Sequence, residues 1–193
     1  MKVIVLFSGG LDSATLLLHL KEAGHEVHAI IFDYSQPHLV ETRHATTFCK
    51  KHEIDYTEVH FKLPETGLLK DAAPSPVIAG RNAVMLSLAA SHAASKGFDA
   101  VAIASNKDDQ PTFPDCGSDF MMKMGLALKS GYGIHLEDLF SEWTKAQIMQ
   151  RALQLKINPS ETWSCYDPQV PSRAYVQICV SERAAQQNIP CGK

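Results

Sequence analysis

Near the start of the chain, six consecutive residues have the composition of a phosphate-binding turn: Ser8, Gly9, Gly10, Leu11, Asp12 and Ser13. They follow the apolar run 3–7 and precede a leucine-rich segment, a position typical of the junction between a buried strand and a helix. The two glycines allow a tight turn that aims several backbone N–H groups at one anion at the positive end of a helix. The serines add hydroxyl donors, and Asp12 either caps the helix or helps to hold Mg²⁺. We call residues 8–13 the phosphate turn.

Two common nucleotide-binding patterns do not fit the phosphate turn. No Gly-Lys-Ser/Thr follows at the spacing of a Walker motif. The third glycine of a dinucleotide fingerprint is also missing, and Asp33 alone does not replace it. Two glycines between a strand and a helix are often only a structural turn, but the full six-residue string in this position favours phosphate binding.

The rest of the chain alternates between segments typical of strands and of helices. Strands are predicted at 3–7, 25–33, 56–61 and 101–104. Helices are predicted from Leu11 up to Gly24 and at 40–52, 82–96 and 144–155, with a polar, proline-rich loop at 63–76. This alternation predicts an α/β fold with a doubly wound, mostly parallel sheet and a small irregular or helical C-terminal tail. We expect one domain at 1–160 and a tail at 161–193 that packs on it.

Parallel sheets of this kind bind ligands at the carboxyl ends of their strands. Three segments of the chain are predicted to lie there: the phosphate turn, residues 33–38 and residues 105–116. The site is therefore expected where these three segments meet.

Bulk composition limits the function classes. The chain has 193 residues, is 45% hydrophobic and carries a formal net charge of −3 with a pI near 6.3. This is ordinary globular composition without the broad basic field that long nucleic acids require. No apolar run reaches the length of a membrane span or a signal peptide, so we expect no membrane association and a cytoplasmic location. Five scattered cysteines favour reduced thiols or metal ligands over a disulfide framework.

The string Ser-Gly-Gly-Leu-Asp-Ser at the end of a first strand resembles the signature of the N-type ATP pyrophosphatases, or PP-loop proteins. Further strings, in the same order along the chain, resemble one family among them, the 7-cyano-7-deazaguanine (preQ0) synthases. These strings are Tyr34-Ser35-Gln36-Pro37-His38, Gly80-Arg81-Asn82, Asn106-Lys107-Asp108-Asp109, Pro114-Asp115-Cys116 with Phe120, Thr144-Lys145, and Trp163-Ser164-Cys165-Tyr166. The resemblance implies an adenine nucleotide α-hydrolase-like fold.

The resemblance also implies a reaction, part of queuosine biosynthesis. A ligase of this family adenylates 7-carboxy-7-deazaguanine with ATP, releases pyrophosphate and, with ammonia as nitrogen donor, converts the carboxylate to an amide and then to a nitrile. Because the substrate carboxylate is the nucleophile, catalysis rests on positioning and on stabilising charge at the leaving pyrophosphate. Mg²⁺ would help to stabilise that charge. Family members resemble dimers, and the alanine-rich helix from Asn82 is a plausible interface.

The resemblance assigns roles to particular residues. The catalytic group is Lys145, Arg81 and Asp12. ATP and pyrophosphate are assigned to the phosphate turn together with Asp33 and Tyr34. The substrate-binding group is Gln36, His38, Arg81, Asn82, Asp109, Asp115, Cys116 and Phe120. Each has a plainer alternative, such as a solvated surface lysine, a surface ion pair, a packed thiol or a core aromatic ring.

The tail departs from the family pattern. The family has a compact Cys-Gly-x-Cys-x-x-Cys for structural zinc, and here only Cys165, Cys179 and Cys191 are present after residue 160. Structural zinc requires four ligands, so loss of the metal is the favoured interpretation, and a three-thiolate site completed by Asp167 or water is the alternative. Ser35, Pro37 and Lys107 also differ near the acceptor. The alternative functions are therefore another adenylating PP-loop enzyme, making an amide or modifying tRNA, and a nucleotide-binding regulator without catalysis.

Overall fold

The computed structural model describes residues 1–34, 39–62, 80–111 and 113–162. Its centre is a five-stranded sheet in the order β3-β2-β1-β4-β5, and every neighbouring pair of strands is parallel. The strands are β1 (Lys2–Leu6), β2 (Glu26–Asp33), β3 (Tyr56–His60), β4 (Ala100–Ala102) and β5 (His135–Glu137). The predicted α/β class with a parallel, doubly wound sheet is confirmed.

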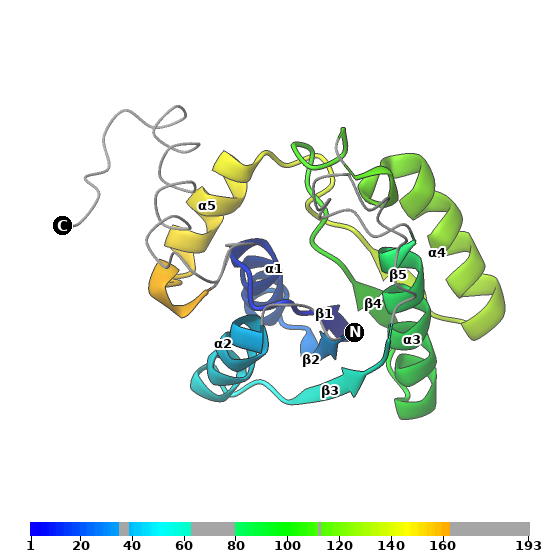
Figure 1. Ribbon diagram of the computed structural model, residues 1–193, viewed down its shortest axis with the longest axis horizontal. Helices are drawn as coiled ribbons and strands as arrows, with labels where there is room; N and C mark the ends of the chain where they lie inside the picture. Colours follow the sequence, from blue (N-terminus) through cyan, green and yellow to red (C-terminus); the bar gives the residue numbers. More distant parts are fainter. Residues whose placement is uncertain (35–38, 63–79, 112, 163–193) are drawn as a thin grey trace, which may run out of the picture.

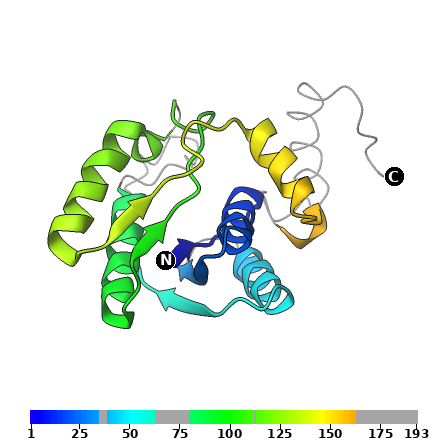
Figure 2. The ribbon, with the colours of Figure 1, turned by 180° about the vertical axis from the view of Figure 1, so that it is seen from behind.

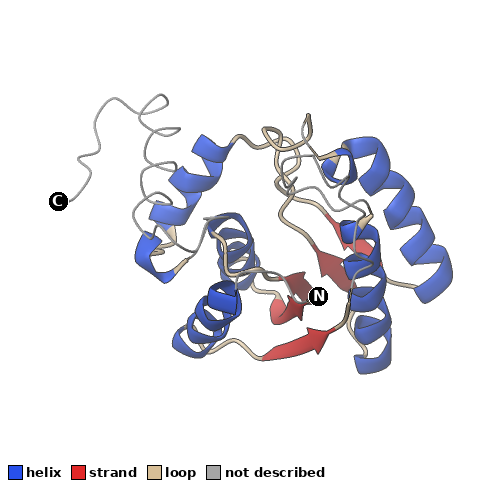
Figure 3. Cartoon of the chain, viewed as in Figure 1, coloured by secondary structure: helices blue, strands red, loops and turns tan. Residues whose placement is uncertain are grey.

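Helices cover both faces of this sheet, as Figures 1 and 2 show from opposite sides. On one face lie α1 (Leu11–Glu22), α2 (Leu39–Lys51) and α5 (Lys145–Gln154), and on the other lie α3 (Arg81–Lys96) and α4 (Ser118–Tyr132). Short 3₁₀ turns, η1 (Pro114–Cys116) and η2 (Pro159–Glu161), complete the described elements. The strands between the two helical layers are drawn in red in Figure 3.

The sequence of β1 explains why it lies in the middle of the sheet. Its side chains alternate between two core clusters: Val3 and Val5 pack on the side of α1 and α2, whereas Ile4 and Leu6 pack on the side of α3 and α4. A strand that is buried on both faces needs a continuous apolar run, and this run is what the sequence shows. The first strand was therefore predictable from a few residues.

One α-helix and one strand were not predicted from the sequence, α4 and β5. The helix α4 contains Gly125, Ser130 and Gly131, which weaken its intrinsic helical signal. The strand β5 has only three residues and is held by pairing with β4, from Ala100↔His135 to Ala102↔Glu137. Tertiary pairing therefore stabilises a strand that is too short to recognise in isolation.

The order of the strands fixes where a ligand binds. The chain runs from β1 outward through β2 to β3, then crosses to β4 and continues to β5 on the other side. The direction of winding thus reverses between β1 and β4, and ligands bind at the carboxyl ends of the strands beside such a reversal. The phosphate turn follows β1, and residues 103–111 follow β4, so both lie at this point.

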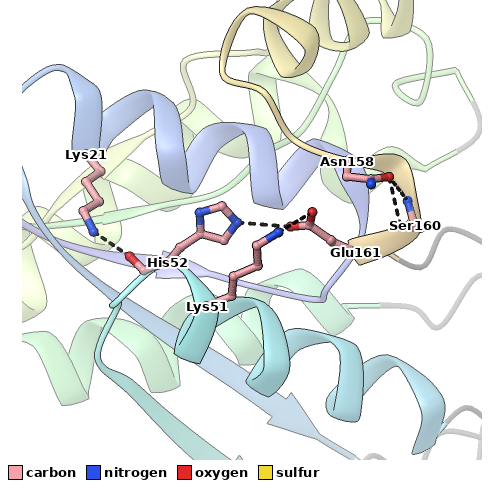
Figure 4. Close-up of polar contacts among 6 residues, drawn as sticks. All are labelled: Lys21, Lys51, His52, Asn158, Ser160 and Glu161. Carbon is pink, nitrogen blue, oxygen red and sulfur yellow. Dashed lines mark hydrogen bonds and ion pairs between the residues drawn. The ribbon is translucent and has the colours of Figure 1, made fainter.

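The end of the described chain is attached to α2, as Figure 4 shows. The Glu161 carboxylate of η2 lies between Lys51 and His52, with Lys51 Nζ 2.7 Å from Oε1 and His52 Nε2 3.3 Å from Oε2. Burial opposes ionisation of Glu161, but hydrogen bonds and charges from both partners outweigh it and lower the pKa. The expected tail, 161–193, lies outside the described residues after 162. No helix in the described ranges is long and apolar enough to cross a membrane.

Candidate active site

The phosphate turn is held in shape by its own two serines. Ser13 Oγ donates to Gly10 O at 3.1 Å and lies 3.1 Å from Ser8 Oγ, and Gly10 N donates to Ser8 Oγ at 3.2 Å. Gly9 has φ 84°, a left-handed conformation that a residue with a side chain rarely adopts. Gly10, and not Asp12, is the N-cap residue of α1, and Asp12 lies in the first turn of that helix. The turn therefore presents two hydroxyls and the backbone at a helix N-terminus.

Asp12 belongs instead to a chain of polar contacts beside the turn. Its Oδ2 accepts a hydrogen bond from Asn106 Nδ2 at 3.0 Å, and the same amide nitrogen donates to Asp109 Oδ2 at 2.8 Å. Asp109 Oδ1 in turn lies 2.8 Å from Lys145 Nζ. The first turn of α1, the loop after β4 and the first residue of α5 thus contribute to one cluster. We call Asp12, Asn106, Asp109 and Lys145 the carboxylate–lysine cluster.

Burial raises the pKa of Asp12 from 3.8 to about 6. The Lys145 charge opposes the shift, the Asp109 charge adds to it, and the hydrogen bond from Asn106 opposes it. Asp12 is therefore ionised near neutral pH, but at an energetic cost. A carboxylate in such an environment is well suited to a divalent cation, because the cation would remove that cost.

Lys145 is placed by the start of α5. Thr144 is the N-cap and forms a reciprocal capping box with Gln147, so the helix begins at a fixed residue. Asp108 Oδ2 accepts a hydrogen bond from Lys145 N at 2.8 Å, which ties the helix to the loop after β4. The preceding loop is anchored by Phe140, which is fully buried and stacks on Trp143 with ring centroids 4.6 Å apart. The predicted helix start at Thr144 is confirmed to within one residue.

A second group of predicted residues joins α3 to η1. Asn82 N donates to Asp115 Oδ2 at 3.1 Å, and Asn82 Nδ2 donates to Asp115 O at 3.0 Å and to Cys116 Sγ at 3.4 Å. Burial raises the pKa of the Cys116 thiol to about 11, with the charges of Asp115 and Asp109 adding to the effect, and the hydrogen bond from Asn82 and the charge of Arg81 opposing it. The thiol is therefore protonated at neutral pH and unsuited to nucleophilic attack. Because the charges of Asp109 and Arg81 both act on the Cys116 thiol, the contacts between α3 and η1 lie next to the carboxylate–lysine cluster.

The other predicted residues lie around these two groups. Arg81 Nη1 donates to Tyr34 OH at 3.4 Å, which brings the end of β2 to the start of α3. Asp33 Oδ2 lies 3.2 Å from His60 Nδ1 at the carboxyl ends of β2 and β3. Phe120 is half-buried on α4 and packs against the core cluster between the sheet and α3. Tyr34 and Phe120 thus both have core contacts, and Tyr34 also contacts Arg81.

Some predictions fall outside the described residues, and some contributors were missed. Gln36, His38 and the cysteines Cys165, Cys179 and Cys191 lie outside the described ranges. Asn106 and Asp108 were present in the motif but were not assigned roles, although the spacing Asn-x-x-Asp pointed to Asn106. In the described part of the chain, no group of three or more His, Cys, Asp or Glu side chains is arranged to hold a metal. Two carboxylates, Asp12 and Asp109, still match Mg²⁺, which usually takes one or two protein carboxylates together with substrate phosphates.

Fold and site together define the class: a PP-loop protein, with a Ser-Gly-Gly-Leu-Asp-Ser turn after the first strand of a parallel sheet. Two solved structures share the fold at low identity. The U34-tRNA thiolase NcsA from Methanococcus maripaludis superposes with a TM-score of 0.61 at 18% identity, covering 100% of this chain and 76% of that one. The NH3-dependent NAD synthetase from Campylobacter jejuni superposes with a TM-score of 0.56 at 14% identity, covering 99% and 90%.

The sequence comparison is more specific. The family model described as "Queuosine biosynthesis protein QueC" matches residues 2–188. A 7-cyano-7-deazaguanine synthase from Caldicellulosiruptor bescii is 34% identical over 86% of this chain and 83% of its own length. Another, from Thermoplasma acidophilum, is 33% identical over 86% of this chain and 79% of its own length. The chain belongs to the QueC family.

Proposed function

We propose that this chain is an ATP-dependent ligase that converts 7-carboxy-7-deazaguanine and ammonia to 7-cyano-7-deazaguanine in queuosine biosynthesis. Membership of the QueC family supports the overall reaction. The observation that carries the proposal within the structure is the phosphate turn beside the carboxylate–lysine cluster. This arrangement combines an anion site, two carboxylates for a divalent cation and an ammonium group.

The reaction requires two activations of the same carbon. In the first, the substrate carboxylate attacks the α-phosphate of ATP, which gives an acyl adenylate and pyrophosphate, and ammonia then displaces AMP to form the amide. In the second, the amide oxygen attacks the α-phosphate of another ATP and releases pyrophosphate and a proton, and loss of AMP and a second proton leaves the nitrile. Both activations need the same groups, because each develops negative charge on a leaving pyrophosphate.

The chain's own residues have distinct roles in this proposal. The turn backbone and the hydroxyls of Ser8 and Ser13 hold the pyrophosphate, and Lys145 and Arg81 stabilise its developing charge. Asp12 and Asp109 would hold Mg²⁺, which supplies charge neutralisation at the phosphates when bound, and for Asp109 this proposal replaces the substrate contact that the resemblance implies. The hydroxyls of Ser8 and Ser13 lie next to each other at the N-terminus of α1, and this arrangement favours an anion over a neutral ligand.

We assign the deazaguanine to the side of the carboxylate–lysine cluster that faces away from the phosphate turn. Asp115 would accept hydrogen bonds from the purine-like edge, and Asn82 and Cys116 fix its loop through the contacts to α3. Tyr34 and Phe120 would flank the flat heterocycle, and Asp33 would face the nucleotide. Gln36 and His38 complete the proposed acceptor side from outside the described residues.

Several further expectations belong to the proposal. The use of ATP and ammonia supports a cytoplasmic enzyme without a membrane or long nucleic acid as partner, and a homodimer remains our expectation from the family. We also propose that residues 161–193 form a tail that packs on the main domain without structural zinc, because only three cysteines follow residue 160. Elemental analysis of untagged protein tests the last point, and one zinc per chain would contradict it.

One assay tests the main proposal. The protein is incubated with ATP, Mg²⁺, ammonium and 7-carboxy-7-deazaguanine, and AMP, pyrophosphate and product mass are followed together. We expect AMP and pyrophosphate in equal amounts and a product with the mass of the nitrile. Absence of AMP with this acceptor would reject the proposal, and a product that stops at the amide would limit it to the first activation.

A matched pair of variants tests the role of the phosphate turn. Ser13→Ala removes a hydroxyl at the turn, whereas Ser87→Ala removes a hydroxyl that donates to Ala83 O within α3. We expect Ser13→Ala to lower turnover at least about tenfold, in the range of a lost charge-stabilising donor, with little change in thermal stability. Equal losses of rate in both variants would contradict the assignment.

A further inference from the structure

Asn106 is a fully buried amide, with 0% of its surface exposed, at the end of the segment that follows β4. Its Nδ2 donates to Asp12 Oδ2 at 3.0 Å and to Asp109 Oδ2 at 2.8 Å. Its Oδ1 accepts a hydrogen bond from Asp109 N at 3.0 Å. An amide side chain offers two N–H donors and one carbonyl oxygen, and all of these groups are engaged.

The contacts of Asn106 have two structural roles. The bond from Asp109 N to Oδ1 is local and closes the loop 106–109, as an Asn side chain often does in turns. The two bonds from Nδ2 are different, because they join carboxylates that come from α1 and from the loop after β4. Loop closure alone would not require an amide that donates to both carboxylates.

The bridging position has an electrostatic reason. Asp12 and Asp109 have like charges, and the Asp109 charge is one of the causes that raise the pKa of Asp12. The N–H groups of Asn106 Nδ2 lie between the two carboxylates and allow them to stay close while ionised. Because Asn106 is part of the segment that follows β4, its amide fixes their separation better than a mobile water would. Asp109 also holds Lys145 Nζ at 2.8 Å, so any shift of Asp109 moves the ammonium group as well.

We propose that Asn106 is a positioning residue that fixes the spacing of the Asp12 and Asp109 carboxylates for a divalent cation bound with ATP. This inference rests on the ATP half of the proposed function and not on the identity of the acceptor. Residues that orient metal ligands through hydrogen bonds typically contribute about 10–100-fold to metal affinity. Asn106 is expected to contribute in that range.

The two structural roles of Asn106 can be separated by substitution. Asn106→Ser keeps a hydroxyl that can accept from the backbone of the loop, but the shorter side chain cannot reach both carboxylates. Asn106→Ala removes both the hydrogen bond that closes the loop and the bridge between the carboxylates. Gln110→Ala is the matched control, because Gln110 Nε2 ties the same loop to Ser141 O at 2.8 Å without contacting either carboxylate.

The measurement is calorimetric binding of ATP to the full-length protein, first in EDTA and then as the Mn²⁺ complex, without acceptor. The ratio of the two affinities isolates the gain that the metal provides. We expect Asn106→Ser and Asn106→Ala to lose about 10–100-fold of this gain while affinity for metal-free ATP changes little. Gln110→Ala is expected to keep the wild-type gain. Equal losses with and without metal, or an unchanged gain in both Asn106 variants, would overturn the proposal.

A double-mutant cycle tests whether the effect passes through the carboxylates. In the Asp12→Asn background one of the two bridged groups is neutral, so Asn106→Ser should cost much less of the remaining metal-dependent gain. Additive losses would mean that Asn106 acts by another route and would also overturn the proposal. Because no acceptor is present, a protein that fails to make the nitrile but shows this binding pattern would refute the proposed function and leave the role of Asn106 standing.

Discussion

Replacing Asp12 by Asn should make the metal-free protein more stable while abolishing synthesis. Burial raises the pKa of Asp12 from 3.8 to about 6. At pH 8 the folded protein therefore holds an ionised carboxylate whose burial costs folding stability. Asparagine has nearly the same shape, keeps an oxygen that can accept from Asn106 and carries no charge to bury. The same charge is the one proposed to hold Mg²⁺, so its loss should stop turnover.

The size and pH dependence of this gain follow from linkage. A shift from 3.8 to about 6 corresponds to about 3 kcal/mol at 1.36 kcal/mol per pKa unit. Because the Asp12 side chain keeps some contact with solvent, we expect about 1–3 kcal/mol, or roughly 2–10 °C in Tm for a chain of this size. Between the two pKa values the folded state binds a proton that the unfolded state has lost, so the stability of the wild type falls as pH rises through this window. The advantage of Asp12→Asn should therefore be about half as large at pH 5 as at pH 8.

Thermal and urea unfolding in EDTA at both pH values measure this difference directly. Asp119→Asn is the matched control, because Asp119 is 74% exposed on α4 and pairs only with Lys123 in the described chain, so its effect should be below about 0.5 kcal/mol. Added Mg²⁺ and ATP should stabilise the wild type more than Asp12→Asn. A variant no more stable than the wild type at pH 8, or one with a larger advantage at pH 5, would refute the reasoning.

Three further outcomes are expected. Lys145→Ala should lower kcat at least about 100-fold through loss of charge at the pyrophosphate, whereas Lys123→Ala, which also breaks an Asp–Lys pair, should leave kcat unchanged; similar rates for both would contradict the role of Lys145. Glu161→Gln should cost about 1 kcal/mol of unfolding free energy at pH 7, measured with urea, because it weakens the contacts with Lys51, the last residue of α2, and with His52, the residue after it. The pKa of Glu161 is lowered, so that cost should disappear as pH falls through and below its ordinary value of 4.5, and a cost that persists in acid would argue against it. Cys116 should react slowly with iodoacetamide at pH 8, as followed by peptide mass spectrometry, because burial raises the pKa of its thiol to about 11; rapid labelling in the folded protein would show that the thiol is accessible and ionised.

Local sequence was sufficient for the parts of the site that depend on one segment. The phosphate turn and the start of α5 are each specified by adjacent residues, Gly9 and Gly10 in the first case and Thr144 with Gln147 in the second. Their backbone conformations follow from residue type, so they could be predicted without knowledge of the rest of the chain.

The contacts between segments could not be predicted in this way. Asp12 and Asn106 are 94 positions apart, and they meet only because β1 pairs with β4 in the register Val3↔Ala100. Asn106 was visible as part of a motif, but nothing local indicates that its amide bridges two carboxylates. The strand β5 was missed for the same reason, because its stability comes from pairing with β4 and not from its three residues.

The carboxylate–lysine cluster also explains why this site sits at the reversal between β1 and β4. Asp12 comes from the element that follows β1, and Asn106 and Asp109 from the loop that follows β4, so pairing of these two strands sets their separation. Lys145 arrives from α5, which packs against α1, the helix that carries Asp12. Each charged group is thus fixed by a different part of the core. Holding these charges close together costs folding stability. The raised pKa of Asp12 is the sign of that cost, and in the proposed function a cation bound with the phosphates of ATP would offset it.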